Sequence, residues 1–163
     1  MENFKPTKYT LKCVATGREF DDAGWVLDDA ECKTPSLVRA NYSKKQLELK
    51  PDSYGLYKFC DWLPVKRILE GSSAPVTYKS EALAKHLGLS NLWITLNGYF
   101  PRRGAKMRTC SFKETEAYSV CARIDENEDR VLVVASAGNT ARAFARVCSD
   151  NNIKLLLVVP SDN

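Results

Sequence analysis

The chain has 163 residues, of which 44% are apolar and 27% charged, a composition typical of a soluble globular protein. Its net charge of +4 is mild and unclustered, and no apolar run is long enough to span a membrane, so neither a nucleic-acid partner nor a membrane is expected. The start carries no signal-peptide pattern and the six cysteines are scattered, which favours free thiols in the cytoplasm.

Residues 1–65 are predicted to form a small β-rich lobe. Residues 9–14 alternate as a strand does, residues 21–24 read as a turn, and short strands are expected at 24–27 and 36–39. These elements indicate a small antiparallel sheet.

The second predicted domain, residues 66–163, begins with weaker signals. A loop is expected at 71–76, a short helix at 80–87 with Ser80 as its cap, and a strand at 92–96. His86, the only histidine, lies on that helix with no neighbour in sequence to orient it, so a surface or packing role is favoured over catalysis. The sequence therefore does not support a histidine-based hydrolase.

A strongly basic segment follows the strand at 92–96. It contains four cations within seven residues, namely Arg102, Arg103, Lys106 and Arg108. Such a cluster is often only a solvated loop. Because cationic side chains bind phosphate or sulfonate oxygens, one or two of these residues are instead candidates to attract a doubly charged anion.

Lys113 is the candidate for amine chemistry. Ser111 and Glu114 match the S-x-x-E capping box, which predicts that a helix begins at Ser111 and that Lys113 lies in its first turn. The positive end of the helix dipole favours the neutral amine, the form that condenses with an aldehyde. By itself the motif is also compatible with a solvated lysine.

Residues 131–159 predict a strand, an anion-binding loop, a helix and a second strand. The apolar run at 131–135 is typical of a strand buried on both faces, and apolar residues recur with helical period over 139–149. In the loop at 136–140, Gly138 allows close approach of a ligand, and the amides of the helix start can hold an anion. With the strand at 154–159 this is a right-handed crossover between parallel strands.

Together, the lysine segment and the loop at 136–140 resemble the pyridoxal-phosphate enzymes of the tryptophan-synthase-β fold type, over roughly residues 70–163. The resemblance implies that Lys113 carries pyridoxal 5'-phosphate and that Asn139 binds the ring oxygen of the cofactor. It also implies that Ser136, Gly138, Asn139 and Thr140 grip the substrate carboxylate. The fold class implied is α/β, a mainly parallel, helix-covered sheet preceded by the small antiparallel lobe.

Some threonine synthases in this family carry a zinc ribbon in the region of that lobe. Here Cys13 and Cys32 stand alone, because Thr16 and Pro35 occupy the positions that would complete two Cys-x-x-Cys pairs. Two isolated thiols cannot make the usual four-coordinate zinc site, so we expect a ribbon-shaped lobe without metal.

The N-terminal lobe and the basic segment most resemble the archaeal cysteate synthases, which exchange the phosphate of O-phosphoserine for sulfite and so lead to coenzyme M. Threonine synthase, acting on O-phosphohomoserine, is the nearest alternative. In both, the lysine also serves as acid and base. The expected partner is a small anionic amino acid. The sequence leaves open the leaving group, the nucleophile and whether residues 102–108 contact the substrate.

Two further alternatives remain. The family's cofactor-phosphate loop and its partner for the pyridine nitrogen are absent from the sequence, so the chain is expected to be an N-terminal fragment, inactive alone, of a protein that could be a homo-oligomer. A non-catalytic module retaining the fold is then one alternative. Tyr99 and Phe100 beside the basic segment give the other, a single-strand nucleic-acid binder.

Overall fold

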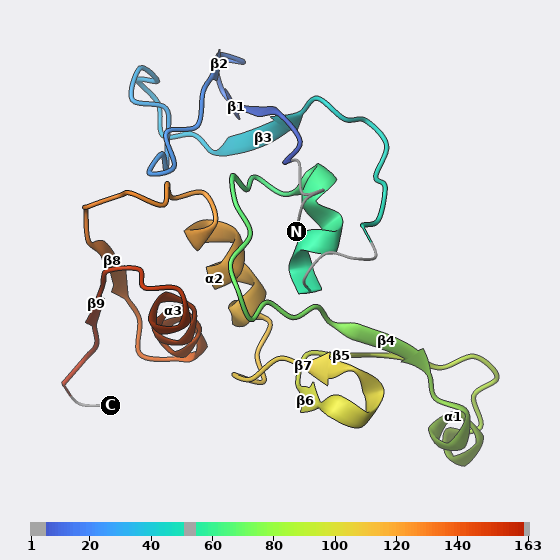
Figure 1. Ribbon diagram of the computed structural model, residues 1–163. Coiled ribbons are helices and arrows are strands. Elements are labelled where there is room, and N and C mark those ends of the chain that lie inside the picture. The colour runs from blue at the N-terminus through green and yellow to red at the C-terminus, as the bar shows by residue number, and fades with distance from the viewer. Residues whose placement is uncertain (1–5, 51–54, 162–163) are drawn as a thin grey trace.

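The structure, a computed structural model, describes residues 6–50 and 55–161 (Figure 1). The two predicted domains also include residues 1–5, 51–54 and 162–163, which lie outside this description. In chain order the elements are β1 (Tyr9–Cys13), β2 (Glu19–Phe20), β3 (Val38–Tyr42), η1 (Gly55–Trp62), β4 (Val76–Lys79), α1 (Glu81–Leu87), β5 (Trp93–Leu96), β6 (Tyr99–Phe100), η2 (Pro101–Arg103), β7 (Ala105–Lys106), α2 (Lys113–Cys121), β8 (Leu132–Ala135), α3 (Asn139–Asp150) and β9 (Leu155–Val158). None of the helices in these ranges is long and apolar enough to cross a membrane.

The N-terminal sheet is antiparallel, with strand order β2-β1-β3 and Tyr9 paired with Tyr42. The predicted strand at 9–14 is confirmed, and β3 begins two residues after the start of the one predicted at 36–39. The predicted strand at 24–27 is wrong. Gly24 has a positive φ of 87°, and its amide donates to the Asp22 carboxylate at 2.8 Å, so the chain turns here instead of extending.

Strands β4 and β5 form an antiparallel hairpin that carries α1 at its tip, away from the rest of the chain (Figure 1). The loop expected at 71–76 ends one residue early, because Val76 already pairs with Leu96. The expected helix is present, but Ser80 makes no side-chain capping bond, and Gly88 ends the helix with a φ of 69°.

Strands β8 and β9 pair in parallel through α3, as the pattern of residues 131–159 predicts. The prediction that this first strand is buried on both faces is wrong, because Val133 is 58% exposed. In the partner strand β9, half-buried and exposed residues alternate, and Leu156 is 53% exposed. Among the described residues, α3 covers only one face of these two strands. The α/β class is confirmed, whereas the mainly parallel sheet remains a prediction because the other sheets described are small and antiparallel.

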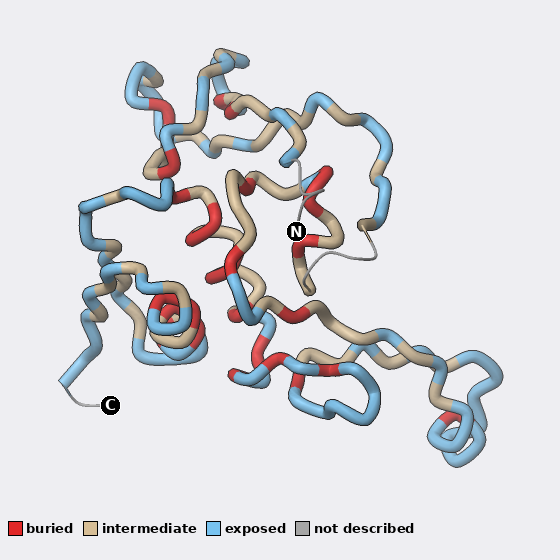
Figure 2. Tube along the Cα trace, in the orientation of Figure 1, coloured by how far each residue is buried: buried red, intermediate tan, exposed pale blue. Residues whose placement is uncertain are grey.

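The core lies where α2, α3 and η1 meet, and Figure 2 shows the buried positions gathered along these helices. Tyr57 of η1 meets Tyr118 of α2 edge-on with ring centroids 6.4 Å apart. The thiols of Cys121 and Cys148 lie 3.8 Å apart between α2 and α3. Both cysteines are almost fully buried and pack there as small apolar side chains.

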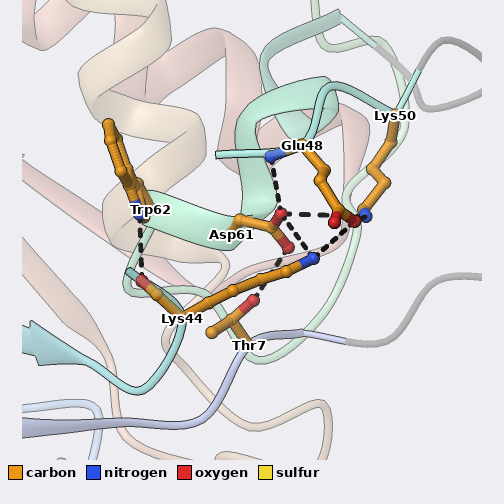
Figure 3. A network of polar contacts seen from close by, with 6 residues as sticks. All are labelled: Thr7, Lys44, Glu48, Lys50, Asp61 and Trp62. Atoms are coloured by element: carbon orange, nitrogen blue, oxygen red, sulfur yellow. Dashed lines mark hydrogen bonds and ion pairs between the residues drawn. The ribbon is translucent and has the colours of Figure 1, made fainter. Parts of the chain in front are cut away.

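Polar networks connect the N-terminal segments to this core. The Asp22 carboxylate accepts from Arg123, just after α2, at 2.8 and 2.9 Å. Asp61, at the end of η1 and 2% exposed, accepts hydrogen bonds from the Thr7 hydroxyl and the Glu48 amide, each at 3.0 Å, and pairs with Lys44 at 2.9 Å (Figure 3). Burial raises the pKa of Asp61, but these bonds outweigh it and bring the pKa to about 2.

Candidate functional site

Lys113 is the first residue of α2, so its predicted place in the first helical turn is confirmed. The predicted cap is one residue off, since Phe112 occupies the N-cap position and makes no side-chain cap. The Ser111 hydroxyl instead accepts from the Lys113 amide at 3.3 Å, and the Glu114 carboxylate accepts from the Thr109 amide at 2.7 Å. Glu114 therefore reaches past Ser111 and fixes the chain just before the helix.

The side chain of Lys113 is one-third exposed and lies beside a carboxylate. Its Nζ is 2.6 Å from Glu116 Oε2, three residues along the same helix, and 5.2 Å from the centre of the Phe112 ring. Glu116 is therefore the ion-pair partner of the Lys113 amine.

The loop at 136–140 connects β8 to α3. The Ser136 amide donates to the Val158 carbonyl at 3.0 Å, which ties the loop to the end of β9. Gly138 is the N-cap of α3, and the first helical hydrogen bond runs from the Arg142 amide to its carbonyl. The amides of the first turn thus have no helical acceptor, while Asn139 is exposed.

Open space surrounds Gly138, because a Cβ built there would meet no atom within 4 Å. Its φ of −107° is one that other residues adopt, so the backbone itself does not demand glycine. Space for a ligand beside free helix-start amides fits an anionic group such as a phosphate or carboxylate. The loop residues and Lys113 thus fit pyridoxal phosphate in their chemistry, although their binding roles remain predictions.

The two predicted segments begin two helices that pack in one core. Lys113 starts α2 and Asn139 starts α3, and these helices pack together through Cys121 and Cys148. None of the hydrogen bonds or ion pairs within residues 6–50 and 55–161 connects Lys113 with the loop at 136–140.

The basic segment is divided between two environments. It forms the β6–η2–β7 hairpin and the stretch that leads to α2, and all four of its cations are exposed. The guanidinium of Arg103 stacks on the Tyr78 ring at 4.5 Å, and Arg102 lines none of the pockets described. Lys106 and Arg108 line a pocket of about 530 Å³ between this hairpin, α2 and α3.

Two features were missed by sequence reasoning. The contact of Glu116 with Lys113 follows from their spacing of three on a helix, a signal that was present in the sequence. The approach of Cys13 and Cys32 was not readable, because it depends on two turns 19 residues apart in the chain. Thr16, through its side chain and its backbone, lowers the pKa of the Cys13 thiol to about 7.

The Cys13 and Cys32 thiols lie within hydrogen-bonding distance of each other, yet within the described ranges no group of three or more His, Cys, Asp or Glu side chains could hold a metal ion. Thr16 and Ser36 hydrogen-bond to Cys13 in place of further thiols. The metal-free lobe remains a prediction.

Comparison with known proteins extends these observations. Residues 72–163, more than half of the chain, match the family model described as pyridoxal-phosphate dependent enzyme. The curated relatives include proteins named cysteate synthase from Methanosarcina mazei, 46% identical over 94% of this chain and 36% of the relative, and from Methanococcoides burtonii, 48% identical over 96% and 37%. A protein with the same name from Methanosarcina barkeri is 43% identical over 98% of this chain and 36% of the relative.

The chain therefore spans little more than a third of the length of the curated relatives it matches. No solved structure gives a significant match.

Proposed function

The chain belongs to the family of pyridoxal-phosphate dependent enzymes. From this premise we propose that it is part of a cysteate synthase, an enzyme that replaces the phosphate of O-phosphoserine with sulfite. The observation that carries the proposal is the identity of 46% and 48% to proteins named cysteate synthase, which extends through the N-terminal lobe as well as the family domain. Threonine synthase, the alternative substrate class, is not favoured by these relatives.

Lys113 is proposed to carry the cofactor and to move the substrate proton. Bound pyridoxal phosphate supplies an electron-withdrawing ring that stabilises negative charge on the α-carbon of an amino acid. The Nζ atom of Lys113 takes the proton from that carbon and later returns one. Glu116, 2.6 Å from Nζ, holds the protonated amine and orients it.

The loop at 136–140 is proposed to hold the substrate and one edge of the cofactor. The Ser136 and Thr140 hydroxyls and the amides from Gly138 onward bind the substrate carboxylate, since these amides have no helical acceptor. The Asn139 side chain, exposed at the start of α3, hydrogen-bonds the ring oxygen of the cofactor. The open space at Gly138 leaves room for both molecules.

The architecture proposed is that of the family. Residues 66–163 form the first part of a mainly parallel, helix-covered catalytic domain, and residues 1–65 form a separate lobe. Six free cysteines among the described residues suit a reducing compartment, the cytoplasm. The substrate partner is a small anionic amino acid.

An absorbance spectrum of the protein at its natural full length, with pyridoxal phosphate, tests the role of Lys113. We expect a visible band that borohydride removes, with the reduced cofactor fixed on the peptide that contains Lys113. Lys113→Ala should lack the band. The matched control is Lys154→Ala, because Lys154 is an exposed lysine paired with Asp129 far from the predicted site.

Product analysis then selects the reaction. Cysteate and phosphate formed from O-phosphoserine and sulfite support the proposal, whereas turnover of O-phosphohomoserine to threonine would reassign it. A wild-type protein that stays colourless with pyridoxal phosphate would favour the non-catalytic module instead.

A further inference from the structure

The pocket lined by Lys106 and Arg108, here called the basic pocket, lies beside the helix start that carries Lys113. Its walls come from four parts of the chain: the loop at 70–72, the β6–β7 hairpin with the residues that follow it, α2 through Glu114 and Tyr118, and α3 through Arg146. Glu114 directly follows Lys113, so the pocket borders the first turn of α2. Its volume of about 530 Å³ is in the range of pockets that bind small molecules.

Two cations of the basic segment line the same pocket. Ala105, Met107 and Thr109 are buried, whereas Lys106 and Arg108 between them are exposed. Lys106 ends β7 and Arg108 lies in the turn that follows, and both side chains line the basic pocket. Neither takes part in any of the ion pairs within residues 6–50 and 55–161.

Two of the three acidic residues that line the pocket, Glu114 and Asp150, are already engaged, and the third, Glu70, is exposed. The Glu114 side chain is 2% exposed, and its carboxylate accepts from the Thr109 amide at 2.7 Å. Asp150 is bonded to Arg146 at 2.7 Å. Glu70 is therefore the remaining acidic residue of the pocket, and no ion pair joins it to Lys106 or Arg108 among the described residues. These two cations are available to an anion from solution.

The floor of the pocket is a close contact between Gly71 and α2. The Tyr118 hydroxyl donates to the Glu70 carbonyl at 3.1 Å and lies 2.8 Å from the place where a Cβ of Gly71 would stand. Gly71 also has a φ of 84°. The floor of the pocket is therefore fixed by backbone and a buried tyrosine, which gives the pocket a defined shape.

We propose that the basic pocket binds the phosphate group of the amino-acid substrate through Lys106 and Arg108. Of the four cations in the segment, these two are the ones aimed at a pocket, whereas Arg103 is stacked on Tyr78 and Arg102 lies outside the pocket. The arginine guanidinium offers a fork that matches two phosphate oxygens, and the lysine adds a point charge. The inference rests on the proposed function for the identity of the amino acid, not for the binding of phosphate.

Calorimetric titration of the protein at its natural full length, stripped of pyridoxal phosphate and at low ionic strength, tests this binding. The probes are inorganic phosphate, O-phosphoserine and serine. We expect phosphate and O-phosphoserine to bind and serine not to. Arg108→Ala and Lys106→Ala should each weaken phosphate binding by about tenfold, the effect of losing one charge-assisted contact.

Arg102→Ala is the matched control, because it removes the same charge from the same segment outside the pocket. Thermal melts should show that all variants are folded. Equal weakening by Arg102→Ala and Arg108→Ala would overturn the proposal, because the attraction would then come from the overall charge of the segment. So would phosphate binding that survives the combined loss of Lys106 and Arg108.

The outcome is separable from that of the proposed function. Phosphate binding that depends on Arg108 in a protein that forms no visible band with pyridoxal phosphate would support the pocket and refute the enzyme assignment. A visible band in a protein that does not bind phosphate would support the enzyme assignment and refute the proposal for the basic pocket.

Discussion

The N-terminal sheet and the β8–α3–β9 unit are stabilised by different interactions. Buried carboxylates hold the N-terminal segments, with Asp29 bonded to Arg18 and Asp22 bonded to Arg123. The β8–α3–β9 unit is held by apolar contacts of Phe144 and Val147, and it leaves apolar side chains exposed on the outer face of its strands.

This difference indicates where each region is vulnerable. A paired buried charge contributes little net stability, but its loss leaves the partner buried and unpaired. An apolar core depends on filled volume and hardly on pH. The N-terminal segments should therefore respond to charge and acid, and the α3 unit to cavities.

The largest expected effect is in the α3 unit. Phe144→Ala removes a ring that is 5% exposed, and the cavity should lower the free energy of unfolding by about 3–5 kcal/mol. Val133→Ala, on the exposed face of the same unit, should cost less than about 0.5 kcal/mol. Urea unfolding followed by circular dichroism measures both, and similar losses for the two would show that this face is covered in solution.

A smaller effect is expected at Asp61. Asp61→Asn keeps the shape of the side chain but loses the charge that binds Lys44, the Glu48 amide and Thr7, so the free energy of unfolding should fall by about 2 kcal/mol. Hydrogen exchange of the Glu48 amide reports the same loss locally. Glu48→Gln, whose side chain is 64% exposed, is the control and should change little. A loss as large for Glu48→Gln would place the stabilisation in the surface pairs.

Acid should weaken the charged region selectively. Arg130 hydrogen bonds hold the pKa of Glu128 at about 2, and Asp61 also titrates at about 2, below the ordinary values of about 3.9 and 4.3 for Asp and Glu. Because both folded pKa values are depressed, their stabilisation is present above about pH 4 and is lost as pH falls toward 2. The urea midpoint measured from pH 5 to 2 should fall more steeply in wild type than in Asp61→Asn, and parallel curves would contradict the assignment.

The smallest effect should come from a charge in the apolar unit. Arg146 and Asp150 form an i,i+4 pair on α3 at 2.7 Å, with side chains about one-third exposed. Asp150→Asn should lower the free energy of unfolding by about 0.3–0.5 kcal/mol, a value typical of such surface pairs. A loss comparable to that of Asp61→Asn would remove the contrast between the two regions.

The elements best predicted from sequence are those with a local cause. Apolar periodicity located β8, α3 and β9, and the S-x-x-E pattern of Ser111 and Glu114 placed Lys113 in the first turn of α2. A turn was expected at 21–24, but the strand expected at 24–27 was wrong, because Gly24 packs against the Arg123 carbonyl, 99 residues away in sequence. The N-cap was misplaced because Glu114 bonds Thr109 instead of completing a capping box with Ser111.

In the candidate site, too, features with a local cause could be predicted and those that depend on distant parts of the chain could not. The identities of Lys113 and the residues of the loop at 136–140 could be read from short motifs, since each motif lies within a few residues. The sequence could not show which cations of the basic segment line a pocket, because the pocket also depends on α3 and on the loop at Gly71. Periodicity alone also did not reveal that one face of β8 is uncovered among the described residues.

Trp25 gives the contact between the N-terminal segments and the chain after α2 an optical signal. Its indole N–H donates to Glu128 at 2.7 Å, and the Arg130 guanidinium lies 4.7 Å over its ring. Trp62 and Trp93 are 45% and 58% exposed and can be replaced by phenylalanine. The remaining fluorescence then comes from Trp25 alone, so its emission wavelength and its quenching report directly on whether the lobe is seated against residues 125–130.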